Sequence, residues 1–204
     1  MGFAGRHAGR NGSRAVTVLE DTITYLEMLE HHVGRRIPAP LDKLALMRAE
    51  TCTVSFYRYL YKAVGEPWLW FERRLIDDTA LGEIISRPTT EIFVLYVRGS
   101  PAGYFELDTA EPRKTKLCYF GLIQEFIGRR LGPSLLQAAI DQAWSRPLDR
   151  FWLHTSTFDH PKALSVYQQA GFVVYARRPV LFEDPREEGI LPRTLGHRLR
   201  PPLA

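Results

Sequence analysis

Cysteine is scarce in this sequence: among 204 residues only Cys52 and Cys118 are cysteines, and neither belongs to a CxxC pair. Two isolated thiols supply neither a disulfide framework nor a zinc site, and they favour a reducing compartment. Long hydrophobic runs are also missing, since no apolar stretch approaches the ~20 residues that a membrane-spanning helix needs. Residues 1–14 lack the apolar core of a secretory signal. We therefore expect a cytoplasmic protein that has no membrane partner and binds no metal.

The positive charge excess is small and lies at the two ends of the chain. The formal net charge is +4. Residues 1–14 contain three arginines and no acidic residue, and residues 186–204 contain four arginines against two glutamates, so the middle carries one net negative charge. A basic face on a folded domain is not required, which argues against a nucleic-acid partner. We predict one domain over residues 15–185, between a disordered N-terminal tail (1–14) and a Pro/Arg-rich C-terminal tail (186–204).

Strand and helix patterns alternate along residues 15–185. Residues 91–97 and 102–108 flank a glycine-containing turn and predict an antiparallel hairpin. Segment 44–47 is too short to assign. In chain order we expect a strand (16–29), two helices (54–64 and one containing Leu75, Leu81 and Ile84), three antiparallel strands (91–97, 102–108, 114–123), a helix (132–144), a strand (150–157), a helix (160–170) and a strand (172–182). This order predicts an α/β domain with a mixed sheet.

A glycine-containing loop joins the strand expected at 114–123 to the helix expected at 132–144. A strand, a loop and a helix N-terminus in this order can bind phosphate, because backbone N–H groups point outward and the helix dipole favours an anion. Arg129 and Arg130 add positive charge to the loop. The loop is neither a Walker loop nor a GxGxxG motif, and a plain turn is the alternative interpretation.

Two segments together resemble the GNAT superfamily of N-acetyltransferases. Gln124-Glu-Phe-Ile-Gly-Arg-Arg-Leu-Gly132 is similar to the family's phosphate loop, and His160-Pro-Lys-Ala-Leu-Ser-Val-Tyr-Gln-Gln-Ala-Gly-Phe172 is similar to a later family segment. Both stand on the expected elements in the family's order, and the resemblance covers residues 90–182 well and 15–90 loosely. It implies a GNAT fold, with a mixed, largely antiparallel central sheet flanked by helices. It also implies an enzyme that transfers acetyl from the co-substrate acetyl-CoA to an amine by direct attack on the thioester.

The resemblance also implies the residues that bind CoA. Backbone N–H groups from Gly128 to Gly132 would hold the pyrophosphate, and Leu122 and Gln124 would pair with the pantetheine arm as an added strand does. The N–H of Leu122 would face the thioester carbonyl, and His160 would cap its helix or contact pantetheine. The complete implied set is Leu122, Gln124, Gly128, Arg129, Arg130, Leu131, Gly132 and His160.

The sequence departs from the family pattern at three positions. Ile127, Arg130 and His160 stand where the family usually has Arg or Gln, Gly and Asn, respectively. Glycine at the position of Arg130 would let the backbone approach the pyrophosphate. Arg130 either contacts a CoA phosphate or weakens cofactor binding. The alternative function is therefore a catalytically weak acyl-CoA-binding domain with a regulatory role.

Acetyl transfer to an amine needs two proton movements. The resemblance places Tyr167 at the general-acid position, where it would protonate the leaving thiolate; without the motif it would be interpreted as a core tyrosine. We expect Glu106 to act as the base or to orient the substrate, because its register on strand 102–108 could face the cleft. Asp108 shares that face, and both carboxylates could instead lie on a solvated face.

Two histidines and three aromatic residues can be interpreted as structural or as functional. We interpret His154 as structural, because it stands six residues before His160 on a different element and the two do not form a metal pair. Trp68, Trp70 and Phe71 follow the first helix, where they could line an acceptor pocket or pack in the core. The acceptor, a small-molecule or peptide amine, is not specified by the sequence, and neither is the choice between monomer and homodimer.

Overall fold

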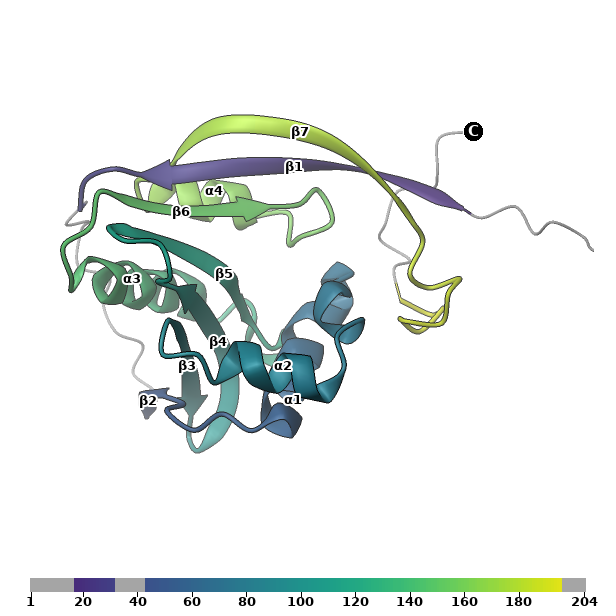
Figure 1. Ribbon diagram of the computed structural model, residues 1–204, viewed down its shortest axis with the longest axis horizontal. Coiled ribbons are helices and arrows are strands. Elements are labelled where there is room, and N and C mark those ends of the chain that lie inside the picture. Colours follow the sequence, from purple (N-terminus) through teal and green to yellow (C-terminus); the bar gives the residue numbers. More distant parts are fainter. Residues whose placement is uncertain (1–16, 32–42, 196–204) are drawn as a thin grey trace, which may run out of the picture.

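The computed structural model describes residues 17–31 and 43–195 (Figure 1), and the predicted tail at 1–14 lies outside the described residues. Within them, one seven-stranded sheet has the order β2-β3-β4-β5-β6-β1-β7. Its pairs are antiparallel except for β5 and β6, which are parallel. The predicted α/β fold with a mixed, largely antiparallel sheet is confirmed. The strands are β1 (Val18–Met28), β2 (Leu44–Arg48), β3 (Thr90–Val97), β4 (Ser100–Asp108), β5 (Lys114–Leu122), β6 (Arg150–Thr155) and β7 (Val173–Glu183).

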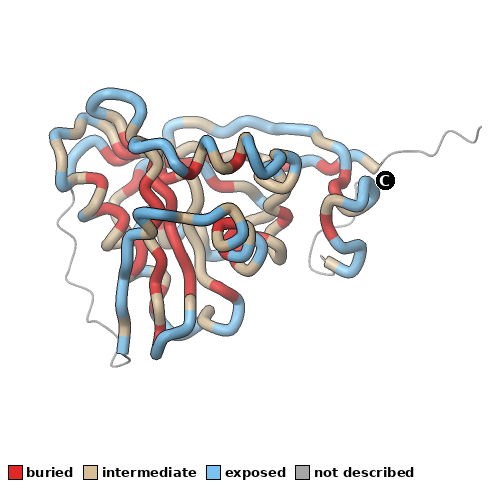
Figure 2. Tube along the Cα trace, turned by 60° about the horizontal axis from the view of Figure 1, so that its bottom comes forward, coloured by how far each residue is buried: buried red, intermediate tan, exposed pale blue. Residues whose placement is uncertain are grey.

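Helices cover both faces of the sheet. Alternate residues of a strand point to opposite faces, so Val94 and Leu95 on β3 belong to two different clusters. Figure 2 shows neighbouring buried segments running side by side inside the domain, with exposed segments around them. Helices α1 (Val54–Gly65) and α2 (Asp78–Ile85) pack on the face of Val94, and α3 (Leu131–Trp144) and α4 (Ala163–Gln169) pack on the face of Leu95.

Side-chain caps begin the first two helices. Thr53 accepts a hydrogen bond from the amide of Phe56 at 3.3 Å, and Asp77 accepts one from Ala80 at 2.8 Å. Helix α4 begins at Ala163, three residues later than predicted, because His160 to Lys162 form a turn before it. Strand β2, which was too short to assign from sequence, gains its partners from β3.

Strand β1 lies between β6 and β7, although it is far from both in sequence. Thr24 is opposite Thr155 on β6 and opposite Arg177 on β7. In Figure 1, β1 and β7 run side by side along one edge of the molecule. The sequence predicted β1 as a strand but carried no signal for this position.

The two parallel strands separate before β5 ends. Their last paired residues are Leu117 and Leu153, whereas β5 continues to Leu122. The pairing of β4 with β5 is irregular at the same place, because Cys118 is an extra residue between Leu117 and Tyr119. The separation leaves an opening in the sheet beside the second half of β5.

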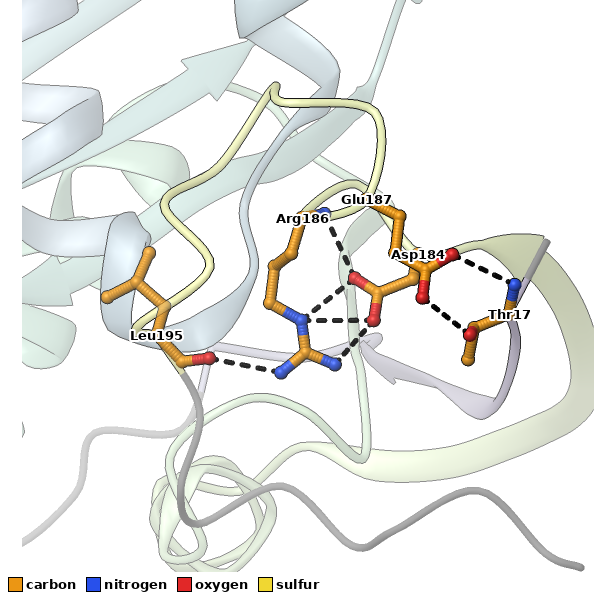
Figure 3. A network of polar contacts seen from close by, with 5 residues as sticks. All are labelled: Thr17, Asp184, Arg186, Glu187 and Leu195. Carbon is orange, nitrogen blue, oxygen red and sulfur yellow. Dashed lines mark hydrogen bonds and ion pairs between the residues drawn. The ribbon is translucent and has the colours of Figure 1, made fainter. Parts of the chain in front are cut away.

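The chain after β7 packs back on the domain as far as Leu195. Leu191 is 2% exposed and forms a cluster with Leu19 and Leu69. Arg186 donates to Asp184 and to the carbonyl of Leu195, and Glu187 accepts two hydrogen bonds from Thr17 (Figure 3). These contacts fix ten residues of the predicted C-terminal tail, 186–195, against the domain, while residues 196–204 lie outside the described range. The domain boundary at 185 stays a prediction. In the described part of the chain, no helix has the length and apolar character to cross a membrane.

Candidate active site

A cavity of about 610 Å³ opens where β5 and β6 separate. Its walls come from β5, the loop before α3, α4, the turn between β6 and α4, the segment after α1, and the ends of β1 and β7. Ligand sites in proteins commonly have this volume and a mainly apolar lining. The cavity is therefore the candidate active site.

The edge of β5 offers backbone groups to this cavity. The amide of Ile123 donates to the carbonyl of Ala102 on β4 at 2.9 Å. Because successive amides in a strand point to opposite edges, the N–H of Leu122 points away from β4, and Leu122 lines the cavity. Gly103 lets the two strands lie close, since a Cβ there would come within 2.5 Å of the Gly121 carbonyl oxygen. This edge can pair with an extended ligand.

The loop before α3 has two residues in the left-handed backbone region. Gly128 has φ of +88°, which glycine adopts freely, and Arg130 has φ of +60°, which costs a side-chain-bearing residue about 1–2 kcal/mol. Arg130 is the N-cap of α3 and makes no side-chain capping bond. The first amides of α3 therefore stay available at the cavity wall.

Most of the cofactor residues implied by the sequence meet at the cavity. Two of them, Gln124 and Arg129, are exposed and lie off its wall, and the guanidinium of Arg129 sits over the ring of Phe126 at 5.0 Å. The implied residues that line the cavity are Leu122, Gly128, Arg130, Leu131, Gly132 and His160.

Tyr167 reaches the cavity from α4, and His160 reaches it from the turn before that helix. Tyr167 lines it while its ring packs on Phe120 and Phe172, at centroid distances of 5.9 and 6.1 Å. Burial raises the pKa of Tyr167, and the nearby carboxylate of Asp159 raises it further, so the hydroxyl keeps its proton. Nδ1 of His160 accepts the backbone N–H of Lys162 at 3.1 Å, immediately before α4.

Glu106 does not line the cavity. Its side chain is buried under α1 and the following segment, where Arg73 donates to it at 2.9 Å and the Tyr57 hydroxyl donates at 2.5 Å. Burial raises the pKa of Glu106, and the contacts with Arg73 and Tyr57 oppose that rise. The guanidinium of Arg73 also sits over the ring of Tyr119, which does line the cavity, at 5.3 Å. Glu106 therefore lies behind the cavity wall, where it is paired with Arg73 and is opposite Tyr119 in the sheet.

Three carboxylates and one histidine that sequence reasoning did not place here line the cavity: Asp21, Glu72, Asp159 and His154. Burial and Lys116 lower the pKa of His154, while the three carboxylates oppose the shift, so its imidazole is neutral at pH 7. His154 stands beyond Leu153, where β6 has left β5, and this depends on a strand register that the sequence does not show.

Asp159 links the two sides of the cavity. It accepts hydrogen bonds from the Thr155 hydroxyl at 2.7 Å, the Ser156 amide at 2.9 Å and the Trp70 indole at 3.1 Å. Burial raises the pKa of Asp159, and these donors oppose the rise. The ring of Trp70 lies directly on Gly65, where a Cβ would come within 2.3 Å of it. Trp70 is thereby held between α1 and the β6–α4 turn.

Cys118 contributes a thiol to the cavity but not a reactive one. Burial raises its pKa to about 12, with Glu106 adding to the rise. A thiol with this pKa is almost fully protonated at neutral pH, which disfavours an acyl-cysteine intermediate. Within residues 17–31 and 43–195, no group of three or more His, Cys, Asp or Glu side chains is placed to hold a metal ion.

A model of the acetyltransferase (GNAT) family matches residues 54–172, more than half of the chain. The chain belongs to the GNAT acetyltransferase family, as the two motifs predicted. The match leaves out β1, β2 and β7, which supply part of the sheet, and β1 and β7 also supply part of the cavity wall. No curated protein matches the sequence.

Solved structures with this fold share little sequence with the chain. An aminoglycoside acetyltransferase from an uncultured soil metagenomic sample, in complex with trehalose, has a TM-score of 0.53 and 12% identity, covering 63% of this chain and 87% of that one. A Bacillus subtilis acetyltransferase in complex with CoA has a TM-score of 0.50 and 19% identity, covering 66% and 79%. A functionally unknown conserved protein from Staphylococcus epidermidis has a TM-score of 0.55 and 15% identity; it covers 82% of this chain, which spans only 63% of it.

Proposed function

We propose that the protein transfers an acetyl group from acetyl-CoA to an amine. The observation that carries the proposal is the continuous cavity, which runs from the N-terminus of α3 along the free edge of β5 to Tyr167. Acetyl-CoA supplies the acetyl group as a thioester; the amine attacks its carbonyl carbon, the C–S bond breaks, and the products are an amide and CoA thiol. The family assignment supports this reaction class, and the protonated thiol of Cys118 favours direct attack.

The residues around the cavity suggest how CoA would be held. Amides from Gly128 to Gly132 would bind the pyrophosphate, helped by the dipole of α3, with Arg130 at its side. The N–H of Leu122 would donate to the thioester carbonyl as negative charge develops on it. Arg129 and Gln124, which are exposed beside the loop, would take part only at its outer edge.

The proton movements need an acid and a base. Tyr167 would give its proton to the departing thiolate, since it faces the cavity with its proton retained. We assign the base to His154, because it is neutral and lines the cavity. Glu106 would help to orient the substrate indirectly. It fixes the guanidinium of Arg73, which lies against the ring of Tyr119. A cytoplasmic location, a monomer or homodimer, and independence from nucleic acid, membrane and metal remain part of the proposal.

Thermal unfolding with and without acetyl-CoA tests the cofactor assignment. A ligand at 100 times its Kd should stabilise the fold by about 2.7 kcal/mol. ATP at the same concentration is the control for non-specific phosphate binding. Release of free thiol with a mixture of amines then tests transfer. Stabilisation by acetyl-CoA with no thiol release from any amine would favour the alternative, a weak acyl-CoA-binding domain, to which the non-glycine residue at Arg130 points.

A further inference from the structure

One part of the cavity has no role in the proposed binding of CoA. The phosphate loop, the β5 edge and α4 account for the side near α3. Five aromatic residues that belong to none of these parts also line the cavity, and we call them the aromatic wall: Trp68, Trp70, Phe71, Phe158 and Phe182. They come from the segment after α1, the β6–α4 turn and the end of β7. Trp68 adjoins the CoA residues, because its ring meets His160 edge-on at 5.1 Å.

The aromatic wall offers ring surface and few hydrogen-bonding groups. Phe182 stacks on Phe71 at 5.5 Å and meets Phe158 edge-on at 5.7 Å. The indole N–H of Trp70 already donates to Asp159, so Trp70 has only its ring to offer a ligand. Hydroxyl groups of a ligand would lose their water here and find few partners, which costs free energy. The wall therefore fits an apolar body.

The charges on the same side favour a cation. Glu72 lines the cavity and is exposed; the Tyr61 hydroxyl donates to it at 3.0 Å, and within the described residues no arginine or lysine is paired with it. Asp21 also lines the cavity and accepts bonds from Ser156 and Thr157 without a cation. The cationic side chains in the lining are Arg130 and Lys162, which precede the first residues of α3 and α4.

We propose that the acceptor is an amine with a single positive charge carried on an apolar, ring-sized body. The body packs on the aromatic wall, and the ammonium group is attracted to Glu72 and to the faces of the rings. The carboxylate of an amino acid would be repelled by Glu72, and a polyhydroxylated polycation would bury unpaired hydroxyl groups. This substrate class rests on the proposed acetyl transfer.

The acceptor panel contains 2-phenylethylamine, phenylalanine, spermidine and sisomicin. Phenylalanine differs from 2-phenylethylamine by one carboxylate, spermidine has no ring, and sisomicin is a hydroxylated polycation. The kcat/KM measured by thiol release should be at least tenfold higher for 2-phenylethylamine than for each of the other three amines. Equal or faster turnover of spermidine or sisomicin would overturn the inference and leave acetyl transfer standing.

Two variants test the residues behind the preference. Glu72→Gln should raise the KM for 2-phenylethylamine about tenfold and reduce the discrimination against phenylalanine, because the charged contact is lost while the shape is kept. Glu83→Gln, on the exposed face of α2 and away from the cavity, is the matched control and should change neither. Phe182→Leu should weaken the binding of 2-phenylethylamine and leave the Kd of acetyl-CoA unchanged. Equal KM values in the Glu72 variant and wild type would remove the role of Glu72 and overturn the inference.

Calorimetry separates failure of the inference from failure of the proposed function. Binding of 2-phenylethylamine, and weaker binding of its uncharged analogue 2-phenylethanol, is expected with or without acetyl-CoA and does not require turnover. No heat from 2-phenylethylamine would overturn the inference even if acetyl-CoA binds. Binding of the amine without binding of acetyl-CoA would support the site and reject the acetyltransferase.

Discussion

The two sides of the cavity are built in different ways. On the phosphate-loop side, the wall comes mainly from two short stretches, 127–133 and 160–167, both inside the family match. On the aromatic side, the wall joins residues from Asp21 to Phe182, and β1 and β7 lie outside that match. A cofactor that is common to a family needs one arrangement of backbone, whereas an acceptor can be changed by exchanging side chains on outer elements. We therefore expect substitutions to separate cofactor binding from acceptor binding.

The largest effect should come from Tyr167, the proposed acid on the phosphate-loop side. Tyr167→Phe keeps the ring and its packing on Phe120 and Phe172 but removes the proton donor. We expect kcat to fall by about 10²–10⁴-fold with the Kd of acetyl-CoA unchanged, because only the transition state loses an interaction. Tyr175→Phe, on the exposed part of β7, is the matched control. A folded Tyr167→Phe protein with full kcat, when chemistry limits the rate, would make Tyr167 a core residue.

His154 should set the acid side of the pH profile. Its pKa lies below the usual 6.5, so the imidazole is neutral at pH 7 and becomes protonated only at lower pH. We expect kcat/KM for the amine to fall as pH drops through this pKa, and His154→Gln to lower kcat by about 10²-fold at pH 7. The same shift makes the unfolded state bind more protons near pH 6, so stability should fall as pH drops below 6.5, and less so in the variant. A variant with the wild-type pH–rate profile would show that the base is another group.

Binding of the amine on the aromatic side should depend on the packing of the chain after β7. Leu191 packs on Leu19 and Leu69 behind Phe71 and Phe182, so Leu191→Ala should lower the free energy of unfolding by about 2–3 kcal/mol. We expect a higher KM for the amine and an unchanged Kd for acetyl-CoA, measured by kinetics and calorimetry. Leu181→Ala, at a β7 position that is 69% exposed, should change neither. Equal weakening of both ligands would show that the two sides are not independent.

Sequence signals were local for the phosphate-loop side and incomplete for the aromatic side, where Trp68, Trp70 and Phe71 were interpreted as possible pocket residues but Phe158 and Phe182 were not. Gly128 and the arginines beside it predicted the phosphate loop, and α3 begins within one residue of its expected position. The alternation along β4 showed that Glu106 and Asp108 share a face, but it could not tell the cavity from the neighbouring pocket where Arg73 meets Glu106. Asp21 lies more than 130 residues from Ser156, its hydrogen-bond partner, and no local pattern encodes such a pair. The place of β1 in the sheet could not be predicted for the same reason.

Arg130 allows charge and backbone to be tested on the phosphate-loop side. Arg130→Ala removes the guanidinium and keeps a side-chain-bearing residue at φ of +60°. If the guanidinium binds a CoA phosphate, binding of acetyl-CoA should weaken by about 1.5–3 kcal/mol, the contribution of a charged hydrogen bond. Arg129→Ala is the matched control, since it removes the same charge one residue away from the cavity wall. Equal losses in both variants, measured by calorimetry, would mean that only the overall charge of the loop matters.

The smallest effect should come from Arg130→Gly, which removes the backbone strain as well as the charge. A side-chain-bearing residue in the left-handed region costs about 1–2 kcal/mol, and glycine removes this strain. Part of the benefit is lost, because glycine has more conformational freedom in the unfolded chain. We expect the free energy of unfolding to rise by about 0.5–1 kcal/mol, measured by urea denaturation. Gly128→Ala should do the opposite, because Gly128 has φ of +88° and a Cβ there meets nothing within 4 Å, so strain is the only penalty. Comparison of Arg130→Gly with Arg130→Ala then isolates the backbone in the binding of acetyl-CoA. Tighter binding by the glycine variant would show that the arginine holds the loop away from its best fit to the pyrophosphate, and equal binding would show that the loop already has that fit.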